Sequence, residues 1–412
     1  MSPRTRHDSL PMVGLVFLCL SVAGAPTLRS QEFPVIGLDG QVRLRGEWDG
    51  RSTGVDPDAA TLSRIRVGVR AQLESWIRAY VQLQDARAWG TEGNTLTDAS
   101  ADQFDLHQGF VEIGTPNRVV ARLGRQEMML GDERLVGAVG WTNTARSFDG
   151  ARVMGRAGGF EWTALWMNVA ERDALAATGL DPQANQGDND DGWLLGGFAS
   201  RSIPGGAIEL TALADRDAAT DESYTVNLRV HSDAGLISYE AAGAVQFGPD
   251  REAYFASGKV GVAHGHGTVA LQLDYLSGDD DPTDAERKAF NTLYATNHKF
   301  YGYMDYVIAF PGQIGEAGLI DAMARAALRL TPRWTMNVDL HRFGTAVERA
   351  GQRALGTELD AIADWSMARL ASLQLGLGVF LPADLAVTLL PAFAGGSDPT
   401  YWGYVQLSLR WP

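Results

Sequence analysis

Arginines repeat at every second position early in this sequence, and this spacing is the pattern best suited to chemistry. Arg43 and Arg45 share one phase, and Arg64, Arg66 and Arg70 repeat it. Residues two apart in a strand lie on the same face, so these guanidinium groups would form rows. If such strands surrounded a narrow channel, rows of guanidinium groups in its lumen would attract carboxylates or phosphates and select anions. Alternatively, each arginine pairs with Asp or Glu and stabilises the wall of the channel. The spacing alone does not separate the two interpretations.

Motifs for catalysis are absent from the sequence. There is no Gly-x-Ser-x-Gly elbow, no His-Glu-x-x-His pair and no phosphate-binding glycine loop. We therefore predict that the protein is not an enzyme.

Two acidic runs, Asp188–Asp191 and Asp279–Asp281, have the oxygen-rich character that Ca²⁺ prefers. In the first run Gly192 stands where an EF-hand would need another ligand, so we predict solvated loops and no cofactor. Binding of Ca²⁺ at these loops is the alternative.

The N-terminus has the pattern of a secretory signal. Arg4 and Arg6 precede the apolar stretch Pro11–Val22, and small residues follow at 23–25. We predict a signal peptide over 1–25, with cleavage between 23 and 31, and a single mature domain over 26–412. The only cysteine, Cys19, lies in the signal, so the mature chain would carry neither a disulfide nor a reactive thiol.

Net charge and hydropathy exclude two classes of protein. A formal charge of −15 argues against nucleic-acid binding. After the signal, no apolar run approaches the roughly 20 residues that a membrane-spanning helix needs.

Alternation of polar and apolar residues is the strongest structural pattern. It runs through Gln41–Trp48, Arg64–Leu73, Arg333–His341 and Val405–Trp411. The polar face carries so many Arg, Gln and Glu residues that it must face water rather than a packed core. The sequence therefore predicts an all-β, transmembrane, antiparallel up-and-down barrel in the outer membrane of a Gram-negative-type bacterium. Dividing roughly 380 mature residues by about 20–23 per strand and connection gives about 16–18 strands.

Connections of two kinds separate these strands. Long polar loops are predicted at 91–103, 179–192 and 278–299, on one side of the barrel, and they alternate with short turns. A capping box at Thr283–Glu286 predicts a short helix near 283–293. The alanine-rich segment 322–330 alternates well enough to be interpreted as a strand.

Three segments resemble the alginate export outer-membrane protein family. They are the stretch 124–153, which contains Arg146-Ser147-Phe148-Asp149-Gly150, the stretch 297–305 and the stretch 356–360. The resemblance implies an 18-stranded monomeric barrel whose electropositive lumen passes an anionic uronate polysaccharide out of the periplasm.

The resemblance also implies which residues line the lumen. Arg125, Arg134 and Arg152 match arginines in or near the family's lumen. Arg45 and Arg66 are also predicted to line the lumen, because they lie on the inward, polar face of their strands and at approximately matching positions in the family. The expected ion-pair partners in the lumen are Glu127, Asp132 and Asp149.

We accordingly predict an anion-selective porin-like channel for passive export of an alginate-like polysaccharide. Its partners would be that polymer, outer-membrane lipid and a periplasmic export scaffold. Two alternatives remain: an anion-selective porin that takes up small acidic solutes, and a structural barrel that hosts a partner protein.

Overall fold

The computed structural model describes residues 33–89, 104–115, 118–170, 192–216, 222–281 and 283–412. The predicted signal peptide and its cleavage site lie outside these residues, as does the acidic run Asp188–Asp191. Pro34–Pro412 forms one compact unit, and that unit is a β-barrel.

In the part of the chain that the structure describes, eighteen antiparallel strands build the barrel. The first nine are β1 (Val35–Gly50), β2 (Asp58–Glu74), β3 (Ile77–Trp89), β4 (Phe104–Gly114), β5 (Val119–Gln126), β6 (Phe148–Ala157), β7 (Phe160–Ala170), β8 (Gly192–Ile203) and β9 (Gly206–Arg216). The others are β10 (Ser223–Ser232), β11 (Ile237–Gly248), β12 (Arg251–His264), β13 (Gly267–Leu276), β14 (Leu319–Thr331), β15 (Trp334–Arg349), β16 (Gln352–Ala368), β17 (Ala371–Pro382) and β18 (Thr400–Trp411).

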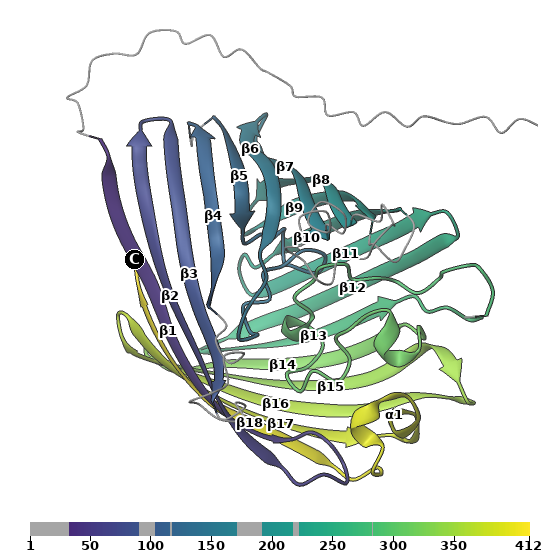
Figure 1. The fold of residues 1–412 in the computed structure, drawn as a ribbon. Coiled ribbons are helices and arrows are strands. Elements are labelled where there is room, and N and C mark those ends of the chain that lie inside the picture. Colours follow the sequence, from purple (N-terminus) through teal and green to yellow (C-terminus); the bar gives the residue numbers. More distant parts are fainter. Residues whose placement is uncertain (1–32, 90–103, 116–117, 171–191, 217–221, 282) are drawn as a thin grey trace, which may run out of the picture. The chain divides into compact units, whose positions relative to one another are not determined.

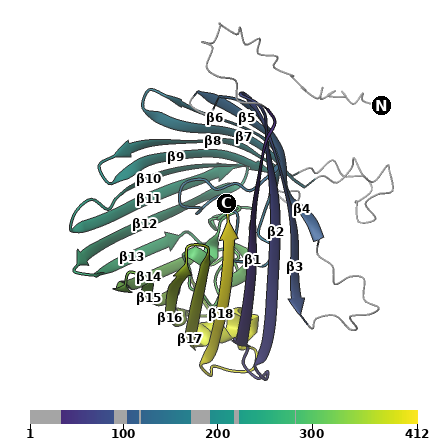
Figure 2. The same cartoon turned by 90° about the vertical axis from the view of Figure 1, so that its left-hand side faces the viewer.

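The sheet closes on itself because β1 pairs with both β2 and β18 (Figures 1 and 2). The closing register runs from Gly40 opposite Trp411 to Gly50 opposite Tyr401. A closed ring leaves no strand edge with unpaired backbone groups, which is a requirement inside a lipid bilayer. The predicted fold class is confirmed, with 18 strands rather than the alternative of 16.

The connections differ at the two ends of the strands. Every connection after an even-numbered strand is short, from two residues at 158–159 to four at 115–118. The connections of more than ten residues all follow odd-numbered strands, as at 127–147 and 277–318. We call these two ends of the barrel the short-turn end and the loop end.

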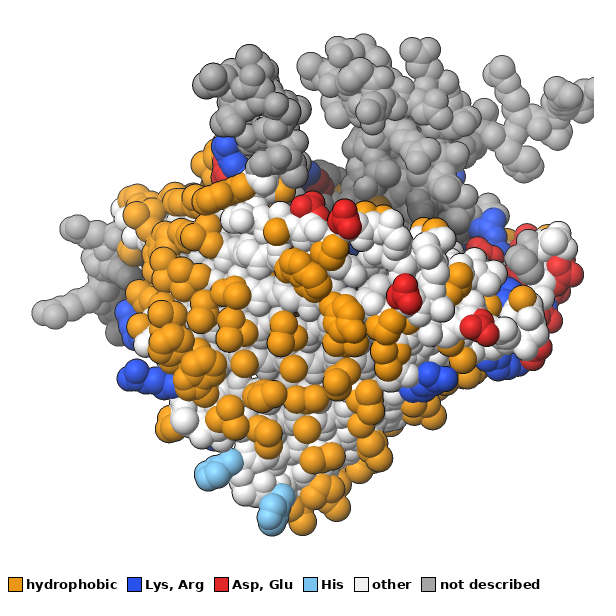
Figure 3. Space-filling view, turned by 90° about the horizontal axis from the view of Figure 1, so that it is seen from below, with side chains coloured by type: hydrophobic (Ala, Val, Ile, Leu, Met, Phe, Trp, Pro, Cys, Tyr) orange, Lys and Arg blue, Asp and Glu red, His pale blue; other side chains and the backbone are white. Residues whose placement is uncertain are grey.

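Exposure of the side chains follows the predicted alternation. On β2, Ile65 is 44% exposed while its neighbours Arg64 and Arg66 are 3% and 7% exposed. Hydrophobic side chains accordingly spread over the face of the barrel that Figure 3 shows. The apolar face lies outside and the polar face inside, which is the reverse of a soluble barrel. None of the described helices is long and apolar enough to cross a membrane.

Two long connections fold into the barrel: the first lumen loop, 127–147, and the second lumen loop, 277–318 (Figure 1). They touch each other where the Gly137 amide donates to the Tyr294 carbonyl at 2.9 Å. The second loop carries η3 (Asn297–Lys299) and η4 (Gly312–Ile314) and buries Met304 against a core that includes Phe380. A further connection with α1 (Asp384–Leu389) and η5 (Pro391–Phe393) joins the same core. The lumen is therefore narrowed by the chain's own loops.

The predicted helix near 283–293 is wrong, because the structure has turns and bends there and no helix. The Asp281 carboxylate accepts hydrogen bonds from the Thr283 amide at 3.1 Å and hydroxyl at 2.5 Å. The Asp284 carboxylate accepts one from the Glu286 amide at 2.8 Å. Such local bonds offer the backbone an alternative to helix formation. The predicted strand at 322–330 is confirmed as part of β14.

The apolar outer face makes a direct prediction about stability. Leu271, in the middle of β13, is 64% exposed on the outer face. Leu271→Arg should cost about 2–4 kcal/mol of unfolding free energy in a bilayer, because a guanidinium group would then face hydrocarbon. Urea unfolding in liposomes measures this cost, with Leu271→Met as the control. An equal loss in both variants would contradict a lipid-facing β13.

Candidate functional site

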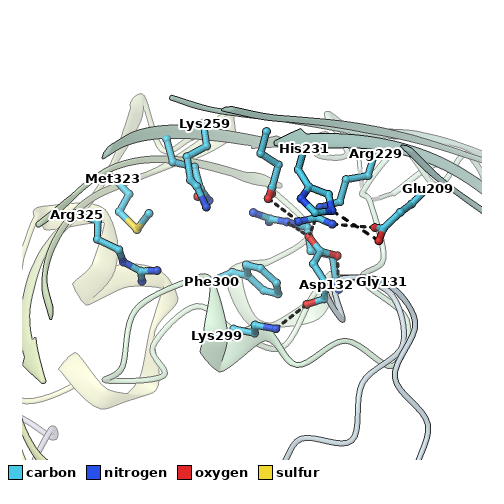
Figure 4. Close-up of a pocket in the computed structure, with 13 residues that line it drawn as sticks. Gly131, Asp132, Glu209, Arg229, His231, Lys259, Lys299, Phe300, Met323 and Arg325 are labelled. Carbon is cyan, nitrogen blue, oxygen red and sulfur yellow. Dashed lines mark hydrogen bonds and ion pairs between the residues drawn. The ribbon is translucent and has the colours of Figure 1, made fainter. Parts of the chain in front are cut away.

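A cavity of about 390 Å³ lies between the barrel wall and the two lumen loops (Figure 4). Wall strands from β9 to β14 contribute one side, and residues 131–134 and 299–300 of the loops contribute the other. The charged and aromatic side chains that line it are Asp132, Arg134, Glu209, Arg229, His231, Glu240, Lys259, Lys299, Phe300 and Arg325. Basic and acidic groups thus share one space inside the lumen.

Arg134 is the most deeply embedded cation of this cavity. Its guanidinium lies 2.7 Å from the Asp274 carboxylate and 3.2 Å from that of Asp132. It also donates to the Tyr301 hydroxyl at 3.2 Å, and Phe300 stacks over it at 4.0 Å. Burial alone would lower the pKa of Arg134, but Asp274 and Asp132 more than offset it and raise that pKa above its ordinary value. Arg134 is therefore a permanently charged anchor between the first lumen loop and β13.

Arg229 is neutralised by its surroundings. It bonds Glu209 at 2.8 Å and Glu240 at 2.7 Å, and Asp132 lies 3.4 Å away. Its charge is therefore more than matched by these carboxylates.

Arg325 forms a two-pronged ion pair with Asp339, with both N···O distances at 2.6 Å. Its side chain remains about one-third exposed and points into the cavity in Figure 4. A paired but accessible guanidinium can still offer hydrogen bonds to a solute.

Lys259 differs from the other cations of the cavity. It faces Glu240 across the β11–β12 pair, but the Glu240 carboxylate is bonded to Arg229. An ion pair needs an N···O distance of 4.0 Å or less, and no carboxylate oxygen of the described residues lies that close to the Lys259 ammonium nitrogen. Lys259 and Lys299 approach the cavity from opposite sides, with Phe300 between them (Figure 4). Lys299 itself has Glu133 at 3.3 Å, so Lys259 is the cation best placed to attract an anion.

Arginines on β1 and β2 have a different task. The Arg43 guanidinium donates to the carbonyls of Gly140, Trp141 and Thr142 at 2.8–3.1 Å. Arg64 donates to the same Gly140 and Thr142 carbonyls at 3.2 and 3.1 Å. These groups hold the first lumen loop against the wall.

Arg45 and Arg66, predicted from phase, do face the lumen and are paired. Arg45 contacts Glu47 at 2.6 Å and lies 4.1 Å from the Trp141 ring. Arg66 contacts Glu127 at 2.9 Å.

Glu127 is the predicted partner that joins Arg66 to a histidine. Its carboxylate lies 2.7 Å from Nε2 of His107. Burial disfavours the charge of Glu127, but His107 and Arg66 outweigh that effect and hold the pKa of this carboxyl below its usual range. Glu127 therefore stays ionised and ties the first lumen loop to β2 and β4.

The prediction that Arg125 and Asp149 line the lumen is wrong. Leu123, two residues before Arg125, is an exposed outer residue, whereas Gln126 faces inward and is fully buried. Arg125 and Asp149 do pair, at 2.7 Å, but on the outer face, where their side chains are 41% and 53% exposed. The resemblance located Arg125 on its strand, but the strand pleat decides the face. The alternation with Leu123 was the signal that could have shown this.

Arg152 does face inward, but it lies away from the cavity. Its direct neighbour across the β5–β6 pair is Arg122. The three arginines of the family resemblance therefore do not converge: Arg134 lines the cavity, Arg152 lies on β6, and Arg125 faces outward. The predicted partner Asp132 does contact Arg134.

Comparison with known families identifies the chain. A family model described as alginate export matches residues 36–387. The chain belongs to the alginate export family. Its barrel fold is shared with solved structures that include an outer-membrane protein.

Three solved structures illustrate the shared fold. OpdK of Pseudomonas aeruginosa is 13% identical with a TM-score of 0.60, over 91% of this chain and 98% of that chain. OccK2 (OpdF) of the same organism, in complex with glucuronate, is 12% identical with a TM-score of 0.60, over 90% and 97%. OccAB4 of Acinetobacter baumannii is 9% identical with a TM-score of 0.62, over 91% and 98%. No curated protein sequence matches the chain.

Among the described residues, no three His, Cys, Asp or Glu side chains are arranged to hold a metal ion. In the acidic run Asp279–Asp281, Asp279 accepts a hydrogen bond from the Asp281 amide and Asp280 pairs with Lys288 at 3.0 Å. These carboxylates engage their own neighbours.

Neither Lys259 nor Lys299 was predicted from the sequence to line the lumen. The whole chain has three lysines, and two of them line this one cavity. Scarcity of lysine, together with the inward phase of Lys259 between Ser257 and Gly261, was the available signal.

Proposed function

We propose that this family member is a passive, anion-selective channel through the outer membrane of a Gram-negative-type bacterium, and that it exports an alginate-like polyuronate. It performs no chemistry on its cargo. The single observation that carries the proposal is Lys259, an inward cation without an ion-pair partner among the described residues, at a narrowed level of the lumen.

The mixture of paired and unpaired cations favours weak binding of a passing anion over tight retention. Arg134, Arg229 and Arg325 are held by carboxylates, so a passing anion meets only a modest net attraction. A channel needs binding that is favourable enough for entry and weak enough for release. Phe300 adds an apolar ring face beside these groups, against which a sugar ring can slide.

Lys259→Gln tests the proposal. A unit charge about 4 Å from a carboxylate in water-like surroundings contributes about 1 kcal/mol, so the permeability ratio of anions to cations should fall roughly fivefold. Reversal potentials across planar bilayers measure this ratio. The control is Lys288→Gln, which changes the same charge in a loop pair with Asp280 and Glu286 outside the cavity. An unchanged ratio in Lys259→Gln would overturn the proposal.

Uptake of small acidic solutes is a second candidate, favoured by the size of the cavity. A volume of about 390 Å³ lies within the range that encloses one small ligand, and the similar OccK2 barrel was solved with glucuronate. Current block by an alginate oligosaccharide, without block by monomeric glucuronate, would favour polymer export. The opposite result would favour uptake.

Partners are proposed on the same basis. The barrel closes within one chain, so we propose that it acts as a monomer that receives polymer from a periplasmic scaffold. The two lumen loops occupy space that a hosted protein would need, which argues against a structural sleeve.

A further inference from the structure

A second basic group lies on the inner wall at the short-turn end. Its members are inward residues of four consecutive strands, and the sheet register places them in one row. Arg78 lies opposite Glu112, Glu112 opposite Arg122, and Arg122 opposite Arg152. We call these four residues the entry row. Arg78, Glu112 and Arg122 also line a cavity of about 480 Å³.

The entry row has more positive than negative charge. Glu112 is its only acid, and it bonds Arg122 at 2.6 Å and Arg78 at 3.1 Å. Arg152 has no carboxylate of the described residues within 4.0 Å, and its buried Nε has no hydrogen-bond partner there. The row thus has three guanidinium groups and one carboxylate, and that carboxylate pairs with only two of them.

The location of the entry row separates it from the cavity around Lys259. The row lies on β3 to β6, between two and six residues from the short turns at 75–76, 115–118 and 158–159. The wall of the other cavity is built by β9 to β14. In outer-membrane barrels the short turns face the periplasm, so the entry row lies at the periplasmic mouth.

We propose that the entry row is a docking site for a carboxylated saccharide chain that arrives from the periplasm. Neighbouring strands are about 4.8 Å apart, so the row presents its cations as a ladder across the wall. One sugar acid can engage one guanidinium group, whereas a chain with a carboxylate on each residue engages several at once. The row therefore prefers an oligouronate over a monomeric uronate, since linked contacts strengthen one another. This inference rests on the proposed function and adds a site and a direction to it.

The test is current block by an alginate oligosaccharide, added to one side at a time of a planar bilayer that holds the full-length protein in one orientation. Wild-type protein should be blocked at lower concentration from the short-turn side. Arg122→Gln/Arg152→Gln should raise the half-blocking concentration about tenfold from that side only. Glu112 keeps Arg78 as its partner in this variant, so no carboxylate is left alone.

The matched control is Arg125→Gln, on the same strand as Arg122 but on the outer face; its block should equal that of the wild type. Arg152→Lys retains the charge without the planar fork, and an intermediate block is expected, which also guards against a folding defect in the double variant. Equal block of the double variant and the wild type, or equal weakening from both sides, would overturn the entry row while leaving the proposed function intact. Absence of block in the wild type from either side would instead overturn the proposed function together with this inference.

Discussion

Arg43→Met/Arg64→Met is expected to release the first lumen loop and to raise the single-channel conductance several-fold. Six hydrogen bonds join these two guanidinium groups to residues 140–143 of the loop. Neither arginine has a carboxylate of the described residues within 4.0 Å, so the loop's carbonyls are the main acceptors for two buried charges. Removing both charges leaves only neutral carbonyls, which water in the lumen can hydrate.

The barrel itself should survive this change, because replacing buried charges with apolar side chains of similar volume is often neutral for stability. The same shift in gel mobility between unheated and heated samples as in the wild type would show that the variant is folded. The control is Arg125→Met/Arg342→Met, which removes two arginines from the outer face, where Leu123 and Leu340 are their exposed neighbours. A wild-type conductance in the Arg43/Arg64 variant would mean that Glu127 and Arg45 suffice to hold the loop.

Arg134→Met is expected to have the largest effect on stability, a loss of about 3–5 kcal/mol. Asp274 is 0% exposed and its carboxylate depends on Arg134 at 2.7 Å. Removing the guanidinium would strand this buried charge and would also loosen Tyr301, which Arg134 contacts from the first lumen loop. Urea unfolding in detergent micelles measures the loss.

A matched variant separates the stranded charge from lost packing. Arg134→Met/Asp274→Asn should recover a large part of the stability, because the remaining amide is neutral and still bonds Ser257. An equal loss in the single and double variants would contradict the ion pair as the cause.

The barrel wall could be predicted from the sequence, because the face on which a strand residue lies depends only on that residue's position in its own strand. Side chains alternate across the pleat, so the inward phase of Arg64 and Arg66 followed from Ile65 and Val67 without any knowledge of neighbouring strands. The same rule correctly identified β14 despite its alanine content. The error at Arg125 came from placing that residue by resemblance alone.

The loops could not be predicted in the same way. A capping-box pattern at 283–286 matched a helix, yet carboxylates of Asp281 and Asp284 bond the local backbone instead. Whether a polar loop folds into a lumen depends on partners far away in the sequence. The wall residue Arg43, for example, donates a hydrogen bond to the carbonyl of Gly140, 97 residues later.

The sequence by itself thus determined the fold class and the inward rows of arginine, since period-two alternation is a property of a single strand. Only the tertiary structure decided which of these cations remain available to an anion. Nothing in the sequence distinguishes Arg134 from Arg152 as a candidate binding residue. In the structure Arg134 is paired with Asp274, whereas no carboxylate of the described residues lies within 4.0 Å of Arg152. Charge pairing depends on which strands become neighbours and which loops enter the lumen, and both are settled only when the barrel closes.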